Sequence, residues 1–111
     1  MIKLKSPREI ALMRAASQVV VKALAEVRRL AVPGATTADF NEAVAAIFRD
    51  HGATPLFKNY PNPTKGKPPF PAVICASINE QVVHGIPNRR VLKAGDIVSI
   101  DTGCKLNGCC G

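Results

Sequence analysis

One carboxylate stands inside an apolar run close to the last residue of the chain. The run is "DIVSIDTGC", residues 96–104, and the carboxylate is that of Asp101. A charge within a strand of this kind needs a partner, because burying an unpaired carboxylate is costly. Asp101 is therefore either a ligand of a divalent cation or a structural carboxylate that pairs with Lys or Arg, or accepts backbone hydrogen bonds. The stretch alone leaves both interpretations open.

The hairpin that follows Asp101 predicts which position would lie beside it. Asn107-Gly108 is a preferred pair for a two-residue type I′ turn. This turn predicts three facing pairs: Leu106 with Cys109, Lys105 with Cys110, and Cys104 with Gly111. A residue after Gly111 would then face Gly103, on the strand face that carries Asp101, and would be the diagonal neighbour of Asp101. If that residue were acidic, a divalent cation between the two carboxylates would relieve their repulsion.

Two aromatic residues and two histidines are further candidates. Tyr60 and Phe70 bracket a proline-rich loop, and aromatic residues of such loops either line pockets or anchor the loop on the core. His84 follows an apolar pair and is either a general acid or base, or a hydrogen-bonded core residue. His51 precedes a glycine that ends a predicted helix, so we expect it to be a C-terminal helix residue and not a ligand.

The cysteines predict neither a zinc site nor a disulfide framework. No C-x-x-C spacing occurs among the four cysteines, so no zinc knuckle is predicted; they are Cys75, Cys104, Cys109 and Cys110. We expect reduced thiols in a cytoplasmic protein.

Two helices and several short strands are predicted to position these residues. Ser6, Pro7 and Glu9 form a capping box that starts a helix over residues 7–31. Its predicted buried stripe is Ile10, Met13, Ser17 (as a small substitute), Val20, Val21, Leu24 and Val27. A second helix begins after Thr36 or Thr37 and ends at Gly52. Residues 53–71 read as a loop.

The second part of the chain favours strands. β-Branched residues at Val73, Ile74, Ile78, Val82 and Val83 predict two short strands around an Asn79-Glu80 turn. Residues 96–106 predict one strand, and "CCG" begins the return strand of the hairpin. A return strand of three residues would leave the Asp101 strand poorly paired.

The bulk composition is that of one globular domain. The chain has 111 residues, 47% of them hydrophobic, and a net charge of +7. Its basic residues are scattered, with short pairs only at Arg28-Arg29 and Arg89-Arg90, so we expect no specific nucleic-acid partner. No secretory signal or membrane-spanning run is recognisable, and we expect no membrane partner.

The segment "ICASINEQVVHGIPNRRVLKAGDIVSIDTG", followed by "LNG", resembles the bacterial type I methionine aminopeptidases. "IKLKSPREIALMRAASQVV" and "PGATTADFNEA" are similar to the opening helices of that family. The resemblance implies the α/β (α+β) "pita-bread" fold, of which this chain would be the first half: two helices packed on antiparallel strands. It places residues 1–111 in the N-terminal half of a single domain, ending before the second metal-binding aspartate.

The resemblance also implies roles for particular residues. Asp101 matches a metal ligand, and His84 matches a catalytic histidine that contacts the substrate. Tyr60, Phe70 and Cys75 fall near positions that bind the methionine side chain. The implied cofactors are two divalent metal ions (Co, Mn, Fe or Zn), with a monovalent cation near Asn79. The loop "KNYPNPTKGKPPFP" is longer than in many members, which affects the alignment of Tyr60.

The function implied by the resemblance is metal-dependent removal of the initiator methionine from nascent proteins. The implied partners are nascent polypeptide N-termini, with the ribosome as a further candidate, and the intact protein is expected to be a monomer. The alternatives are a non-catalytic binding module of the same fold, for example one associated with the ribosome, or a non-functional fragment. Because other family ligands would lie beyond Gly111, we expect the 111-residue chain alone to be inactive and, with open strand edges, poorly soluble.

Overall fold

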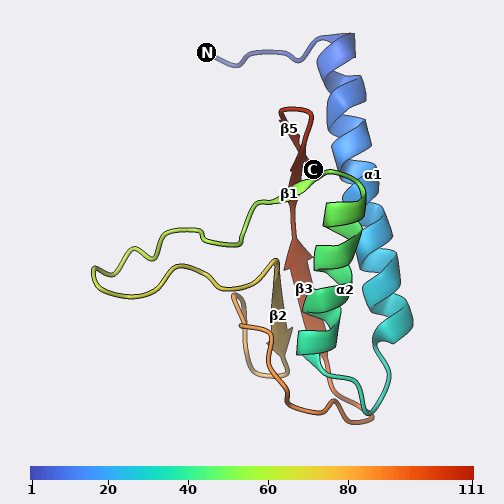
Figure 1. Ribbon diagram of the computed structural model, residues 1–111, viewed down its shortest axis with the longest axis vertical. Coiled ribbons are helices and arrows are strands. Elements are labelled where there is room, and N and C mark those ends of the chain that lie inside the picture. Colours follow the sequence, from blue (N-terminus) through green and yellow to red (C-terminus); the bar gives the residue numbers. More distant parts are fainter.

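A computed structural model describes all residues from 1 to 111 as a mixed α/β structure (Figure 1). Two helices lie along one side of two small antiparallel sheets, and a long loop projects away from them. The elements are α1 (Pro7–Leu30), α2 (Thr37–Asp50), β1 (Thr54–Pro55), β2 (Ile74–Ile78), β3 (Val98–Thr102), β4 (Cys104–Leu106) and β5 (Cys109–Cys110).

Both helices begin at capping boxes. The Glu9 N–H donates to Ser6 Oγ over 3.2 Å and the Ser6 N–H donates to Glu9 Oε2 over 2.7 Å. Thr36 and Asp39 form the same pair of bonds at the start of α2. These bonds satisfy backbone donors that the first helical turn leaves free. The first helix therefore starts as predicted and ends within one residue of the predicted end, and the N-cap of the second is Thr36.

The buried side of α1 differs from the predicted stripe. Ile10, Met13, Val21 and Leu24 are exposed, and the residues that α1 buries are Ala16, Val19, Ala23 and Val27. Small residues are buried here because the backbone of another element lies close to the helix. A Cβ added to Gly111, the residue after β5, would clash with the backbone of Ala16. The core forms where this face meets Phe40, Val44 and Phe48 of α2 and Ile74 and Ile78 of β2.

The predicted strand over residues 96–106 divides at Gly103. β3 pairs with β2 through five residue pairs, from Ile74 with Thr102 to Ile78 with Val98, while β4 pairs with β1 and β5. The expectation that the Asp101 strand would be poorly paired is therefore wrong, because β2 supplies a partner distant in sequence. The hairpin itself is as predicted: Lys105 pairs with Cys110 and Leu106 with Cys109. Asn107 and Gly108 both have the positive φ of a type I′ turn.

The second of the two strands predicted around Asn79-Glu80 does not form. Val82 and Val83 have no strand partner, and their exposed fractions are 84% and 64%. The Gln81 side chain accepts a hydrogen bond from the Ile78 N–H over 2.9 Å, which closes the chain into a turn at the end of β2. The segment then returns along β2 as irregular chain, with Gly85 bonded to it.

Two further features concern the chain as a whole. All four cysteines are free thiols, as predicted. Neither helix has both the length and the apolar character that are needed to cross a bilayer.

Candidate functional site

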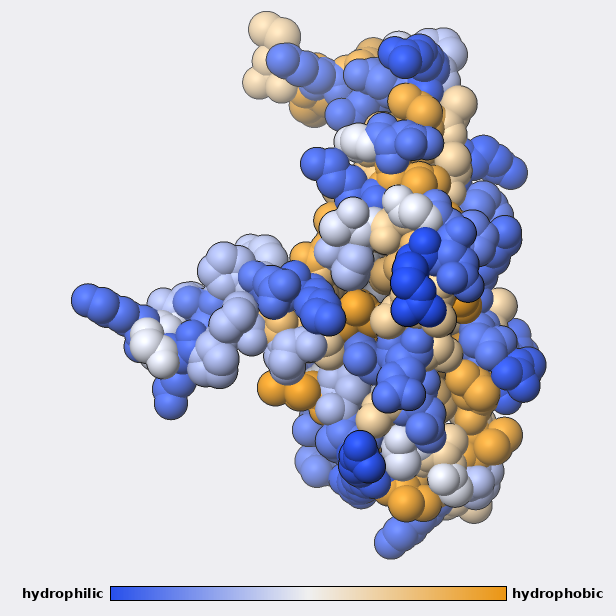
Figure 2. Space-filling view, in the orientation of Figure 1, coloured by the Kyte–Doolittle hydropathy of each residue, from blue (hydrophilic) through white to orange (hydrophobic).

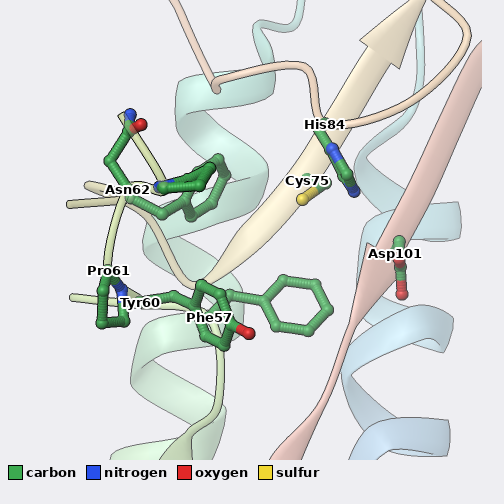
Figure 3. A pocket seen from close by; sticks show the side chains of 9 residues that line it. Phe57, Tyr60, Pro61, Asn62, Cys75, His84 and Asp101 are labelled. Carbon is green, nitrogen blue, oxygen red and sulfur yellow. The ribbon is translucent and has the colours of Figure 1, made fainter. Parts of the chain in front are cut away.

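A pocket of about 600 Å³ lies between the projecting loop and the sheet of β2 and β3 (Figure 3). It brings together all five residues that the sequence analysis singled out for catalysis, substrate binding or metal binding: Tyr60, Phe70, Cys75, His84 and Asp101. It also contains four residues that sequence reasoning missed: Phe57, Pro61, Asn62 and Pro63. Those four belong to an irregular loop, whose course no periodic pattern predicts; their closeness to Tyr60 was the only available signal.

Asp101 is a free carboxylate on the wall of this pocket. It lies on β3 directly across from Cys75 on β2 and is exposed. The 111 residues contain two ion pairs, Arg29 with Glu26 and Arg49 with Asp50, and Asp101 belongs to neither. Unlike Asp96, whose carboxylate accepts two hydrogen bonds, Asp101 accepts none. The structural alternative, a carboxylate held by cations or backbone donors, is therefore not what this chain forms.

His84 reaches the pocket through an unusual backbone conformation. Its φ is 59°, in the left-handed region that residues other than glycine adopt uncommonly, although Asn, Asp and His do so more often than the rest. The adjacent Gly85 fixes it: the Gly85 carbonyl accepts from the Ala76 N–H over 2.9 Å, and the Gly85 N–H donates to the Ser77 Oγ over 3.0 Å. A Cβ at Gly85 would clash with the Ala76 carbonyl. The close approach of Gly85 to β2 thus holds His84 on the same side as Cys75 and Asp101 (Figure 3).

Cys75 contributes a neutral, polarisable surface to the pocket. Burial raises the pKa of its thiol, and the negative charge of Asp101 raises it further. The thiol therefore stays protonated at neutral pH and acts as a small apolar group.

The aromatic wall of the pocket comes from the base of the projecting loop. The Asn59 N–H donates to the Phe70 carbonyl over 2.8 Å, and the Phe70 N–H donates to the Tyr60 carbonyl over 2.9 Å. These two bonds join Phe70 to the segment that carries Tyr60, and both residues line the pocket. Phe57 and Tyr60 lie close together on the loop side of the pocket (Figure 3). Tyr60 is 67% exposed, so it lines the pocket and does not anchor the loop in the core.

Asn79 and His51 lie outside the pocket. The Asn79 Oδ1 accepts from the Ile97 N–H over 2.9 Å, and its amide donates to Asp96 Oδ1 over 3.0 Å. The side chain thus joins the end of β2 to the start of β3, and the cation predicted near it stays a prediction. His51 caps α2 and its Nδ1 lies 2.9 Å from the Ile47 carbonyl, in agreement with the structural position predicted for it.

The donors present in the 111 residues do not complete a metal site. No three His, Cys, Asp or Glu side chains of the chain come together in a way that would hold an ion. Asp101 supplies one oxygen donor of the type that divalent cations bind, and a divalent ion needs several. The 111 residues by themselves therefore do not hold a divalent ion, and Asp101 is the one pocket carboxylate that could contribute to such a site.

The fold is that of a family of metallopeptidases. A family model described as metallopeptidase family M24 matches residues 11–111, and the chain belongs to this family.

Within the family, the chain is similar to bacterial methionine aminopeptidases. It is 43% identical to methionine aminopeptidase 1 of Bacillus subtilis over 108 residues and 44% identical to methionine aminopeptidase 1 of Mycobacterium tuberculosis over 105 residues. These matches cover 97% and 94% of this chain but 41% and 37% of the relatives. The chain thus spans about two-fifths of the length of the curated relatives it matches.

Solved structures give the same result for the fold. The structure of methionine aminopeptidase from Thermotoga maritima matches with a TM-score of 0.85 and 42% identity, over 97% of this chain and 41% of that one. The enzyme from Rickettsia prowazekii matches with a TM-score of 0.85 and 39% identity, over the same shares. The predicted family resemblance and the predicted pita-bread fold are confirmed.

Proposed function

We propose that residues 1–111 are the N-terminal part of a metal-dependent aminopeptidase that removes the initiator methionine from nascent proteins. The proposal is supported by the family membership and by the names of the relatives. The observation that carries it is the pocket, in which a free carboxylate and a histidine face an apolar, aromatic wall.

The wall would bind the methionine side chain. Phe57, Tyr60, Phe70 and Cys75 offer polarisable apolar surface, which suits an unbranched thioether. His84, held in place by Gly85, would donate a hydrogen bond to the carbonyl oxygen or to the leaving amine as the peptide bond breaks. Its fixed backbone reduces the reorganisation needed during the reaction.

Asp101 would be one ligand of two divalent metal ions, whose identity among Co, Mn, Fe and Zn a carboxylate ligand does not select. The remaining ligands would come from chain beyond Gly111, since the 111 residues hold no set of three donors. When bound, such ions would lower the pKa of a water molecule and polarise the scissile carbonyl.

The biological setting belongs to the same proposal. The partners would be nascent polypeptide N-termini, with the ribosome as a further candidate, and the protein would act in the cytoplasm as a monomer. A monovalent cation would lie near Asn79, where the β2 and β3 ends are joined.

The test is to remove the Asp101 charge in the full-length protein and to measure both metal content and methionine release from a Met-Ala-Ser peptide. Asp101→Asn should lower the bound metal and reduce turnover by at least about a hundredfold, because a ligand is lost. Asp50→Asn, which removes the same charge from an exposed position at the end of α2, is the control and should change neither. Normal metal content and turnover in Asp101→Asn would contradict the ligand role. Absence of release and of bound metal in the unmodified protein would favour a binding module.

A further inference from the structure

The projecting loop has an ordered tip. We name residues 58–69 the lysine loop. The Thr64 N–H donates to Asn62 Oδ1 over 2.9 Å, and the Lys67 N–H donates to the Thr64 carbonyl over 3.2 Å. Gly66 takes a positive φ of 82° within this turn. Together with the two bonds between Asn59, Tyr60 and Phe70 at its base, these contacts make the loop a formed projection (Figure 1).

The charge of this loop has one sign. Lys58, Lys65 and Lys67 are exposed, and no Asp or Glu occurs between Asp50 and Glu80. None of the three lysines belongs to an ion pair. In the space-filling view, the loop stands out as a hydrophilic arm beside the body of the molecule (Figure 2). The ammonium groups of these lysines therefore attract anionic groups and repel cationic groups near the loop.

The same loop forms part of the pocket. Pro61, Asn62 and Pro63 line it, and Lys65 follows two residues after Pro63. Lys65 is thus two residues of chain away from the pocket wall. Four residues of extended peptide span at most about 14 Å, which sets how far the third to fifth residues of a peptide can extend from a first side chain in the pocket. The body across the pocket from the loop carries His84 and Asp101 (Figure 3).

We propose that the lysine loop selects substrates that carry acidic residues at their third to fifth positions. This inference rests on the proposed function and adds a charge preference to it, beyond the methionine itself. The contribution is electrostatic: exposed charge pairs attract modestly, like charges repel by similar amounts, and salt screens both.

A nucleic acid is the other anionic partner that lysines suit. Single-stranded nucleic acids bind where aromatic residues interleave with basic ones and stack on the bases. Tyr60, the one aromatic residue of this loop, lies at its base, and Phe70 directly follows the loop; both line the pocket, so the lysine-bearing tip offers no stacking platform. The loop also contains no arginine. The observations therefore favour a peptide.

The experiment compares three peptides on the full-length protein: Met-Ala-Glu-Glu-Ser, Met-Ala-Gln-Gln-Ser and Met-Ala-Lys-Lys-Ser. The kcat/KM for the glutamate peptide should exceed that for the lysine peptide about tenfold at low salt, and this ratio should fall in high salt. Lys65→Gln with Lys67→Gln should reduce the ratio to about twofold while leaving the glutamine peptide unchanged. The matched control is Lys3→Gln with Lys5→Gln, which removes two exposed lysines of the same spacing from the N-terminal arm and should leave the ratio unaltered.

Equilibrium binding of the same peptides, labelled with a fluorophore at the C-terminus, separates two kinds of failure. Acid-selective binding without methionine release would refute the proposed function and keep the charge preference. Methionine release with equal kcat/KM for all three peptides would refute the preference and keep the function. A double variant that loses affinity for a single-stranded oligonucleotide, with peptide selectivity unchanged, would also overturn the inference, since the loop would then be a nucleic-acid surface.

Discussion

His84 holds a backbone conformation that most residues avoid, and the residue after it explains how. A left-handed φ costs a residue with a Cβ about 1–2 kcal/mol relative to glycine. The cost is met by the two hydrogen bonds that tie Gly85 to Ala76 and Ser77. Conformational strain of this kind is concentrated at functional sites. The left-handed backbone at His84 is therefore a reason to test the role proposed for its imidazole.

Two substitutions separate the backbone of His84 from its imidazole. His84→Gly and His84→Ala both remove the side chain, so both should lower kcat in the full-length protein while bound metal stays. His84→Gly should be more stable than His84→Ala by about 1 kcal/mol in urea unfolding, because only glycine adopts φ 59° freely.

Val83 provides the opposite comparison for this prediction. Val83 is exposed, and its φ is not positive. Val83→Gly should therefore be no more stable than Val83→Ala, since glycine gives up more conformational freedom on folding. An equal or reversed order at His84 would mean that the left-handed backbone is not a significant cost.

At the scale of elements, the register of β2 against β3 determines the site. Asn79 bonds to Ile97 through both its backbone N–H and its side-chain oxygen, and to Asp96 through its amide. The second oxygen of Asp96 accepts from the Lys93 N–H over 2.8 Å. These bonds join the C-terminal end of β2 to the N-terminal end of β3. Since side chains alternate along a strand, a slip of one residue would turn Asp101 away from the pocket.

Asp96 makes this junction dependent on pH. The hydrogen bond from the Lys93 backbone, followed by that from Asn79, lowers the pKa of Asp96 below its ordinary value of 3.8. A lowered pKa means that the stabilisation is complete above the unfolded-state pKa and is lost as the pH falls through the folded-state pKa. In urea unfolding, the difference between the unmodified protein and Asp96→Asn should be full at pH 6 and shrink below about pH 4. Asp50→Asn controls for net charge, and a difference that stays constant down to pH 2 would contradict the mechanism.

The elements predicted correctly from sequence are those with local chemistry. The capping box at Ser6, the threonine N-cap of α2 and the Asn107-Gly108 turn each depend on residues a few positions apart, so the sequence contains most of the signal. The pairing of β2 with β3 joins segments that are distant in sequence, so no local pattern predicts it. The apolar pair Val82-Val83 instead suggested a strand directly after the Asn79-Glu80 turn, and this strand does not form. The same limit applies to the site: Asp101 and His84 were recognisable, whereas the pocket residues Phe57 and Asn62 depend on the course of a loop.

For the whole molecule, the chain is less compact than its length predicts. Its radius of gyration is 15.3 Å, whereas a compact domain of this length has about 13 Å. Two features account for this: the projecting lysine loop, and the first part of α1 with the arm before it (Figure 1). No residue before Ala16 is buried, and Ile2, Leu4, Ile10 and Met13 are exposed apolar residues of that part.

The 111-residue chain on its own should therefore associate with itself and should release no methionine. Exposed apolar side chains on α1 and an open edge on β3 favour contacts between copies. No three His, Cys, Asp or Glu side chains of the chain come together to hold the metal ions that the proposed reaction requires. Light scattering over a range of concentrations should show a rising mean mass. The double variant Ile10→Lys with Met13→Lys should lower this mean mass. The control is Val32→Lys with Ile97→Lys, which removes two exposed apolar residues at the other end of the molecule and shows whether the effect belongs to α1. A chain that stays monomeric at high concentration and cleaves Met-Ala-Ser would show that these residues form a complete enzyme.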